Sequence, residues 1–150
     1  MDTIIFDFDG TLCDISHRLH HIKGPQKNWD AFYADCDKDV PKPHIIAMLN
    51  ASLEQGYNVE IWTGRTEAVL EKSHKWLYKN GVPGFRKESL CMRPPGNYTP
   101  DHILKKEWLD EFMSYNAYAP LCVFEDRQRV IDMWKDNNVL CFPVDPWKEE

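Results

Sequence analysis

The sequence lacks several features that would assign it to common classes of protein. It contains no run of about 18 apolar residues, so neither a transmembrane helix nor a membrane partner is expected. No basic segment precedes a long apolar one near the N-terminus, so we expect no signal peptide and predict a cytoplasmic location. The five cysteines are odd in number and include no CxxC pair, which favours reduced thiols over a disulfide framework.

Positive charge is also scarce. The chain has 18 lysines and arginines against 24 aspartates and glutamates, which gives a formal net charge of −6. Proteins that coat nucleic acids present a broad basic surface, so this composition excludes that mode of binding but not a small basic pocket. A length of 150 residues with 43% hydrophobic content predicts one folded domain spanning residues 1–150.

What the sequence does contain is an alternation of short β-type runs with helical stretches. This order predicts an α/β fold, with a mostly parallel sheet covered by helices on both faces in three Rossmann-like layers. Residues about 14–42 are mixed in pattern, and we expect a small cap insert there. Strands are expected at residues 3–6, 58–62, 89–92, 121–124 and 139–142, and helices at residues 29–36, 43–55, 66–79, 100–112 and 127–137, with Thr99 capping the fourth helix.

Polar side chains follow three of the predicted strands directly. In parallel α/β sheets, ligands bind at the carboxyl ends of the strands, so these positions carry the most information about function. Four of them are carboxylates that we expect to converge at one edge of the sheet. The residues are Asp7 and Asp9 after the first strand, Thr63, Gly64 and Arg65 after the second, and Glu125 and Asp126 after the fourth.

Carboxylates held close together repel one another, and removal from water adds to that cost. A hard divalent cation would relieve the repulsion. Because the candidate ligands are all oxygens, with no histidine or thiolate among them, the predicted ion is Mg²⁺ rather than zinc. The structural alternative is a set of solvated loop acids, and the apolar strand that runs directly into DFDGT argues against it.

These motifs resemble those of the haloacid dehalogenase-like (HAD) phosphohydrolase superfamily. The first motif, DxDGT, is present as residues 7–11, the second ends a strand at Thr63, and the fourth is the acidic pair Glu125-Asp126. The third motif, a lysine near a helix start, is best matched by Lys105, with Lys106 as a rival. The four motifs occur in order and span nearly the whole chain.

The resemblance implies a role for each motif residue. Asp7 would be the nucleophile that forms an aspartyl-phosphate, and Asp9 would be the general acid and base. Thr63 would donate a hydrogen bond to the phosphoryl group, and Lys105 would neutralise charge in the transition state. The metal ligands would be Asp7, Asp9 through its carbonyl, and Asp126 in preference to Glu125.

A finer similarity links the chain to the phosphatase half of the phage polynucleotide kinase/3′-phosphatases. It rests on Arg18, on Arg65 within WTGR, on Asp101, and on the closing segment EDRQRVIDMWKDNNVLCFPV. It implies that Arg18, Gly64, Arg65 and Asp101 bind substrate. The family's kinase half carries a GxxxxGK[ST] loop that this sequence lacks, so kinase activity is not expected from this chain. A separate kinase or ligase as a partner stays open at this point.

Three functions therefore remain open at the level of sequence. The leading hypothesis is a Mg²⁺-dependent phosphatase that removes a 3′-phosphate from polynucleotide ends. The first alternative keeps this chemistry but acts on nucleotides or other small phosphomonoesters. The second is a phosphate- or metal-binding module without catalysis.

Overall fold

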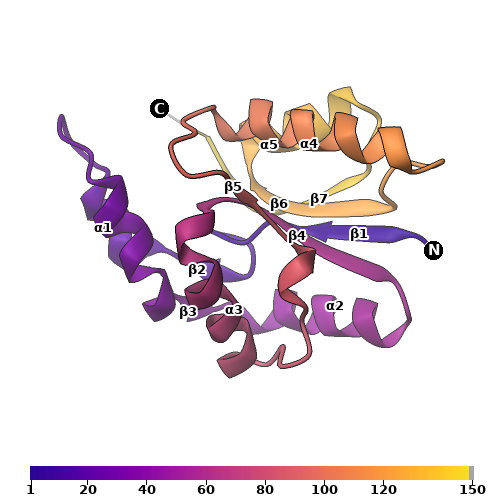
Figure 1. Cartoon of the computed structure of the whole chain (residues 1–150), viewed down its shortest axis with the longest axis horizontal. Coiled ribbons are helices and arrows are strands. Elements are labelled where there is room, and N and C mark those ends of the chain that lie inside the picture. The colour runs from indigo at the N-terminus through magenta and orange to yellow at the C-terminus, as the bar shows by residue number, and fades with distance from the viewer. Residues whose placement is uncertain (149–150) are drawn as a thin grey trace.

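The core of the computed structural model, which describes residues 1–148, is a five-stranded parallel sheet (Figure 1). Its strand order is β5-β4-β1-β6-β7, so β1 lies in the middle with β4 and β6 on either side. This confirms the predicted α/β fold class. The strands are β1 (Thr3–Phe6), β4 (Asn58–Thr66), β5 (Leu90–Arg93), β6 (Cys122–Arg127) and β7 (Cys141–Trp147).

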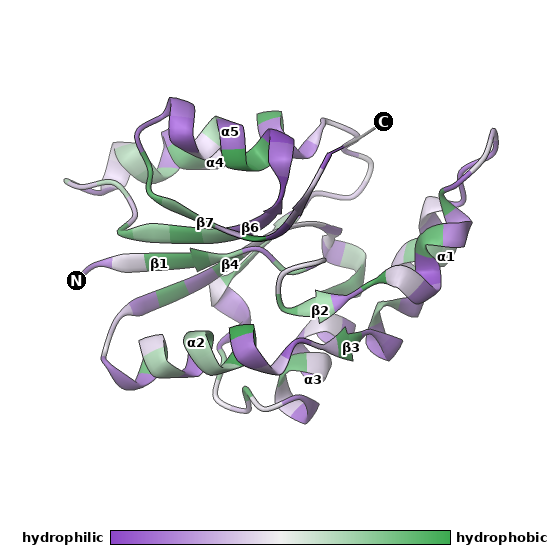
Figure 2. Cartoon of the chain, turned by 180° about the vertical axis from the view of Figure 1, so that it is seen from behind, coloured by the Kyte–Doolittle hydropathy of each residue, from purple (hydrophilic) through white to green (hydrophobic). Residues whose placement is uncertain are grey.

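Helices cover both faces of the sheet, as expected. Figure 1 shows α2 (Pro43–Glu54) and α3 (Leu70–Lys79) on one face, and α4 (Asp101–Tyr115) and α5 (Gln128–Asp136) on the other. Each face has its own hydrophobic core, because successive residues of a strand point to opposite sides. Phe6 packs in the core under α2 and α3, whereas its neighbour Ile5 packs in the core under α4 and α5. In Figure 2, β1 is accordingly largely hydrophobic, whereas β4 has both hydrophobic and hydrophilic segments.

The small insert lies beside the carboxyl ends of the strands (Figure 1). A short antiparallel pair, β2 (Cys13–Asp14) and β3 (Val40–Pro41), closes its base. Between them lie the short helix α1 (Trp29–Ala34) and two 3-10 helices, Ser16–His21 and Asp35–Lys38. These elements occupy the part of the chain, residues about 14–42, where the sequence predicts an insert.

Local boundaries differ from the sequence prediction in several places. Strands β4, β6 and β7 continue several residues beyond their apolar runs, because neighbouring backbones keep pairing after the side chains turn polar. The predicted cap at Thr99 is wrong: Pro100 stands at the N-cap of α4, and no side chain caps that helix. Residues Glu67–Val69 form a 3-10 turn ahead of α3. Within residues 1–148, no helix is both long and apolar enough to cross a membrane.

The packing of α2 predicts a large effect of a core substitution. Leu49 is fully buried, whereas Met48, the preceding residue, is 47% exposed. We expect Leu49→Ala to lower the free energy of unfolding by about 2–5 kcal/mol, through lost burial and the cavity left behind. Urea unfolding followed by circular dichroism measures this. Met48→Ala is the matched control and should change stability by less than about 0.5 kcal/mol; equal effects at the two positions would contradict this packing.

Candidate active site

The ends of β1 and β6 bring the predicted carboxylates together. The backbone N–H of Asp7 donates to the carbonyl of Phe124 at 2.9 Å, so the pairing of the two strands continues to the first acid. Glu125 and Asp126 follow Phe124 directly within β6. Carboxylate oxygens of Asp7, Glu125 and Asp126 all lie within 4.8 Å of one another. We call these three residues the acid cluster.

A buried lysine contacts two members of the acid cluster. Lys105, in the second turn of α4, places Nζ 2.8 Å from Asp7 Oδ1 and 2.9 Å from Glu125 Oε2. Its side chain is 2% exposed. The rival Lys106 lies on the surface and pairs with Asp110. The geometry therefore favours Lys105 as the lysine of the site.

Electrostatics in the acid cluster are unbalanced. Three carboxylates face one ammonium group, so the fully ionised cluster would carry two uncompensated negative charges. Burial, together with the nearby charge of Asp7, raises the pKa of Glu125 to about 8 and that of Asp126 to about 10. Burial lowers the pKa of Lys105, but the charges of Asp7 and Glu125 outweigh it and raise that pKa overall.

The acid cluster suits a hard divalent cation. Its oxygen-only ligands match the preference of Mg²⁺, and a cation would offset the repulsion that raises the two pKa values. The turn after β1 leaves room for this arrangement. Gly10 has a φ of +82°, and a Cβ at that position would lie 1.9 Å from Asp126 Oδ2, so any side chain there would displace the carboxylate.

Asp9 lies in a second cluster, which arginines neutralise. Arg18 Nη2 lies 2.8 Å and Arg65 Nη2 lies 2.7 Å from Asp9 Oδ1, and both guanidinium groups also contact the buried Asp39. Burial raises the pKa of Asp9, but the charges of Arg65 and Arg18 outweigh it, so that pKa is lowered overall. Asp9, Cys13 and Asp39 also have metal-ligand spacing, but two guanidinium groups already balance the two carboxylates.

Arg18 and Arg65 were predicted to bind substrate, and the structure gives them a buried environment. Both side chains are fully buried, and the guanidinium carbon of Arg65 lies 3.7 Å from the ring centroid of Phe8. As they stand, they contact Asp9 and Asp39 rather than the cavity. Direct contact with a substrate phosphate stays a prediction for both arginines. Their ion pairs with Asp9 are observed in the structure.

The end of β4 supplies the next predicted residues. The Thr63 hydroxyl oxygen accepts the backbone N–H of Arg65 at 3.2 Å, and Thr63 lines the cavity beside Asp7. The Gly64 carbonyl accepts hydrogen bonds from the Tyr33 hydroxyl at 3.2 Å and from Arg93 Nε at 2.9 Å. A Cβ on Gly64 would lie 2.6 Å from Asp101 Oδ1, so a larger residue would disturb Asp101.

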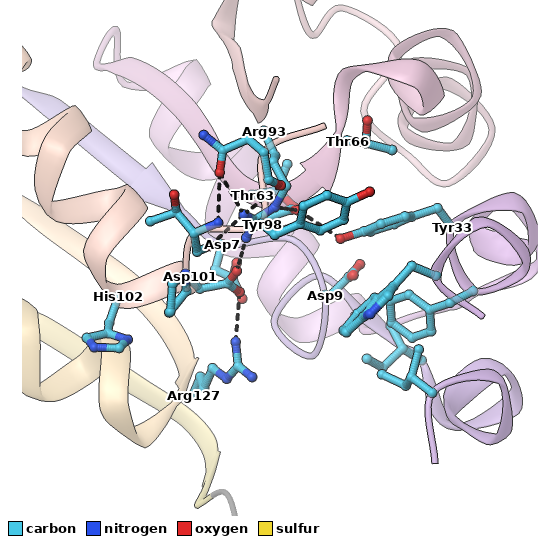
Figure 3. Close-up of a pocket in the computed structure, with 18 of the residues that line it drawn as sticks. Asp7, Asp9, Tyr33, Thr63, Thr66, Arg93, Tyr98, Asp101, His102 and Arg127 are labelled. Atoms are coloured by element: carbon cyan, nitrogen blue, oxygen red, sulfur yellow. Dashed lines mark hydrogen bonds and ion pairs between the residues drawn. The ribbon is translucent and has the colours of Figure 1, made fainter. Parts of the chain in front are cut away.

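Asp101 joins two arginines across the site (Figure 3). Its Oδ1 accepts from Arg93 at 2.5 Å and its Oδ2 from Arg127 at 2.9 Å. Arg93 also donates to the carbonyls of Thr99 and Gly64, which ties the loop of residues 94–100 to the end of β4. Asp101 therefore acts here as a bridge between cations at the start of α4.

A cavity of about 590 Å³ opens beside these residues. Asp7, Asp9, Glu125 and Asp126 lie on its charged side. The opposite side is apolar and aromatic, built from the insert and from the loop of residues 94–100. In Figure 3 the rings of Tyr33 and Tyr98 approach the opening from these two segments. The lining residues of this wall are Ile15, Leu19, Ile22, Trp29, Phe32, Tyr33, Pro94, Pro95 and Tyr98.

Sequence reasoning missed several residues of the site. Asp39 had no signal, because its partners Arg18 and Arg65 are far away in sequence. Arg127 does follow the acidic pair directly, and that position could have indicated it. Trp147 lies beyond the last predicted strand, yet its indole Nε1 donates to Asp126 Oδ2 at 2.6 Å.

Comparison with known proteins identifies the family. A family model of the polynucleotide kinase (PNKP) phosphatase domain matches residues 1–147. The chain belongs to the PNKP phosphatase domain family. The predicted resemblance to HAD phosphohydrolases, and within them to polynucleotide kinase phosphatases, is thereby confirmed.

Solved structures place this PNKP-type domain among larger and more distant proteins. It is 26% and 27% identical to chains from two structures of the Pnkp1/Rnl/Hen1 complex, the first described as an RNA repair complex, with TM-scores of 0.78 and 0.77. The matches cover 100% of this chain but only 44% and 47% of those chains. The domain therefore spans less than half the length of these relatives.

Two other phosphatases share the fold. The class C acid phosphatase from Bacillus anthracis is 19% identical over 97% of this chain and 67% of its own, with a TM-score of 0.69. The D,D-heptose 1,7-bisphosphate phosphatase from B. bronchiseptica, solved with magnesium and phosphate, is 19% identical over 95% of this chain and 79% of its own, with a TM-score of 0.57. The PNKP-type domain thus has the HAD phosphatase fold.

The arginine cluster of this PNKP-type domain makes a prediction about stability. Asp39→Asn removes one of the two carboxylates that neutralise Arg18 and Arg65, and all three side chains are fully buried. We expect the free energy of unfolding to fall by about 3 kcal/mol, because a buried charge loses its partner. Urea unfolding measures this. Asp35→Asn, at a partly exposed carboxylate that pairs with His21 and Lys38, is the control and should cost less than about 1 kcal/mol. An Asp39→Asn variant as stable as wild type would refute the role.

Proposed function

We propose that the protein is a Mg²⁺-dependent phosphomonoesterase that removes a 3′-phosphate from polynucleotide ends through an aspartyl-phosphate. The observation that carries this proposal is the buried acid cluster with Lys105, in a chain that matches the PNKP phosphatase domain over residues 1–147. A phosphatase of the HAD type needs a carboxylate nucleophile, a nearby acid or base, and a cation in one cavity.

Asp7 is the proposed nucleophile and Asp9 the proposed acid and base. A carboxylate oxygen of Asp7 attacks phosphorus, the bond from phosphorus to the ester oxygen breaks, and Asp9 gives that oxygen a proton. Water then attacks phosphorus, Asp9 takes the water's proton, and the bond from phosphorus to Asp7 breaks. Phosphate leaves and both aspartates return to their starting forms.

The environment of Asp9 suits both of its roles in turn. Arg18 and Arg65 favour the ionised carboxylate, which is the form that accepts a proton from water in the second step. An anionic phosphate that enters beside Asp9 would favour the protonated form, because like charges repel. Substrate binding itself would therefore promote the form needed for the first step.

The remaining polar residues position the phosphoryl group and a cation. Lys105 holds Asp7 in place and offsets charge that accumulates near it, and the Thr63 hydroxyl lies at the same end of the cavity. Asp7, the Asp9 carbonyl and Asp126 would hold Mg²⁺, with Glu125 next to them. When bound, Mg²⁺ would reduce the repulsion between the anionic nucleophile and the anionic phosphate.

The aromatic wall supports a nucleotide-containing substrate. Tyr98 is 84% exposed and Trp29 38% exposed, and both line the cavity that holds Asp7. A nucleobase next to the reacting phosphate could stack on such a ring, which is worth about 1–3 kcal/mol per base. Arg127 and Arg129, which also line the cavity, could contact a second phosphate.

A second candidate function keeps the chemistry but uses small substrates, such as nucleotides. The net charge of −6 favours it, because a long polyanion would be repelled outside the cavity. A non-catalytic module is disfavoured, because Asp7, Asp9 and Thr63 line one cavity and the buried Lys105 contacts Asp7. A kinase or ligase partner remains a proposal; similar chains come from a Pnkp1/Rnl/Hen1 complex.

A substrate panel tests the proposed reaction. We expect an oligonucleotide with a 3′-phosphate to turn over faster than one with a 5′-phosphate, a mononucleotide or a sugar phosphate, and EDTA to abolish all turnover. Asp7→Asn should remove activity on the oligonucleotide and on p-nitrophenyl phosphate, measured as phosphate release. The exposed Asp2→Asn is the matched control and should retain wild-type rates. Faster turnover of small sugar phosphates would favour the second candidate.

Removal of one ring tests the aromatic wall. We expect Tyr98→Ala to raise KM for the 3′-phosphorylated oligonucleotide about tenfold, through loss of a stacking contact. Turnover of p-nitrophenyl phosphate, which has no base, should stay near wild type. Tyr98→Phe should retain most of the affinity, and Tyr118→Ala, at an equally exposed residue outside the cavity, is the control. An unchanged KM in Tyr98→Ala would exclude stacking on this ring.

A further inference from the structure

Trp147 reaches the acid cluster through an irregularity in the edge strand β7. Glu125 and Arg127 are two residues apart on β6, whereas their partners on β7, Pro143 and Trp147, are four residues apart. The extra residues include Asp145, which has a positive φ of 42°. Figure 1 shows the end of β7 on the side of the sheet that faces the insert. The bulge thus carries Trp147 to the carboxyl edge of the sheet.

Trp147 contacts two residues of the site from this position. Its indole Nε1 donates to Asp126 Oδ2 at 2.6 Å, and the guanidinium carbon of Arg127 lies 5.2 Å from its ring centroid. The hydroxyl of Thr11 is 3.3 Å from the other oxygen of the same carboxylate, Asp126 Oδ1. Trp147 therefore holds one oxygen of Asp126, whereas the Thr11 hydroxyl, which also lies 3.2 Å from Asp7 Oδ2, shares its one proton between the other oxygen and Asp7.

The donors to Asp126 differ in kind from the donors to its neighbours. Lys105, a cation, contacts Asp7 and Glu125, whereas an indole and a hydroxyl, both neutral, donate to Asp126. A neutral donor fixes the direction of a carboxylate without cancelling its charge. Trp147 thus orients Asp126 without adding a positive charge that would compete with a divalent cation.

We propose that Trp147 is a positioning residue that holds the Asp126 carboxylate in place for the magnesium ion. The inference rests on the proposed function, because it takes Asp126 as a metal ligand. Hydrogen bonds to metal-binding carboxylates from outside the coordination sphere fix their orientation, and their loss usually weakens metal affinity about 10–100-fold. The half-exposed indole also covers part of the cavity wall.

Magnesium binding without substrate tests this role directly. Trp147→Phe keeps a ring but removes the N–H donor. We expect the Kd for Mg²⁺, measured by isothermal titration calorimetry with MgCl₂, to rise about tenfold. The Mg²⁺ concentration at half-maximal hydrolysis of p-nitrophenyl phosphate should rise in parallel, while KM at saturating Mg²⁺ stays near wild type. Trp108→Phe, at a residue of α4 outside the cavity, is the control and should keep the wild-type Kd.

Two outcomes would overturn the proposal. One is a Kd for Mg²⁺ in Trp147→Phe within twofold of wild type. The other, which needs only the wild-type protein, is an indole N–H resonance of Trp147 that does not shift on addition of MgCl₂ in an NMR titration. Failure of the proposed function can be distinguished from failure of this proposal. If Trp147→Phe weakens Mg²⁺ binding but the wild-type protein hydrolyses no phosphomonoester, only the proposed reaction is refuted.

Discussion

Repulsion between buried carboxylates is the constraint around which this site is built. Asp7, Glu125 and Asp126 have oxygens within 4.8 Å of one another, at a place where water is largely excluded. The fold keeps them together because β1 and β6 are neighbours in the middle of the sheet, and their pairing extends to Asp7. Lys105 offsets one of the three negative charges, so the fully ionised cluster has an excess of negative charge that favours binding of a further cation.

The cluster around Asp9 solves the same electrostatic problem in another way. Asp9 and Asp39 are paired with Arg18 and Arg65, so charges balance within the protein and no metal is needed. Two acids only two residues apart, Asp7 and Asp9, thereby acquire different environments. One is left with an excess of negative charge among its neighbours, and the other is surrounded by positive charge. Such a difference in environment is consistent with the different roles proposed for the two aspartates.

The sequence predicts the parts of this arrangement that depend on local pattern. Apolar runs followed at once by carboxylates locate the ends of β1 and β6, and parallel topology then requires those ends to meet. The network of Asp39 was not predictable, because it forms between segments whose spacing carries no signal. Thr99 shows a different limit of sequence-based prediction. Threonine is a favourable N-cap residue, but α4 begins at Asp101, so Pro100 and not Thr99 occupies the N-cap position.

The position of Trp147 shows why the sequence did not predict the extent of β7. The last apolar run stops near Phe142, and Pro143 and Pro146 argue against a continued strand, yet an edge strand tolerates proline because one side needs no partner. Continuation past Pro143 is what brings an indole donor to Asp126. The acid cluster therefore depends on three remote segments, α4 for a charged donor, the turn after β1 for a hydroxyl, and the end of β7 for a neutral N–H. Lys105 and Thr11 both belong to motifs that the sequence shows, Thr11 as the last residue of DxDGT, whereas no motif indicated the end of β7.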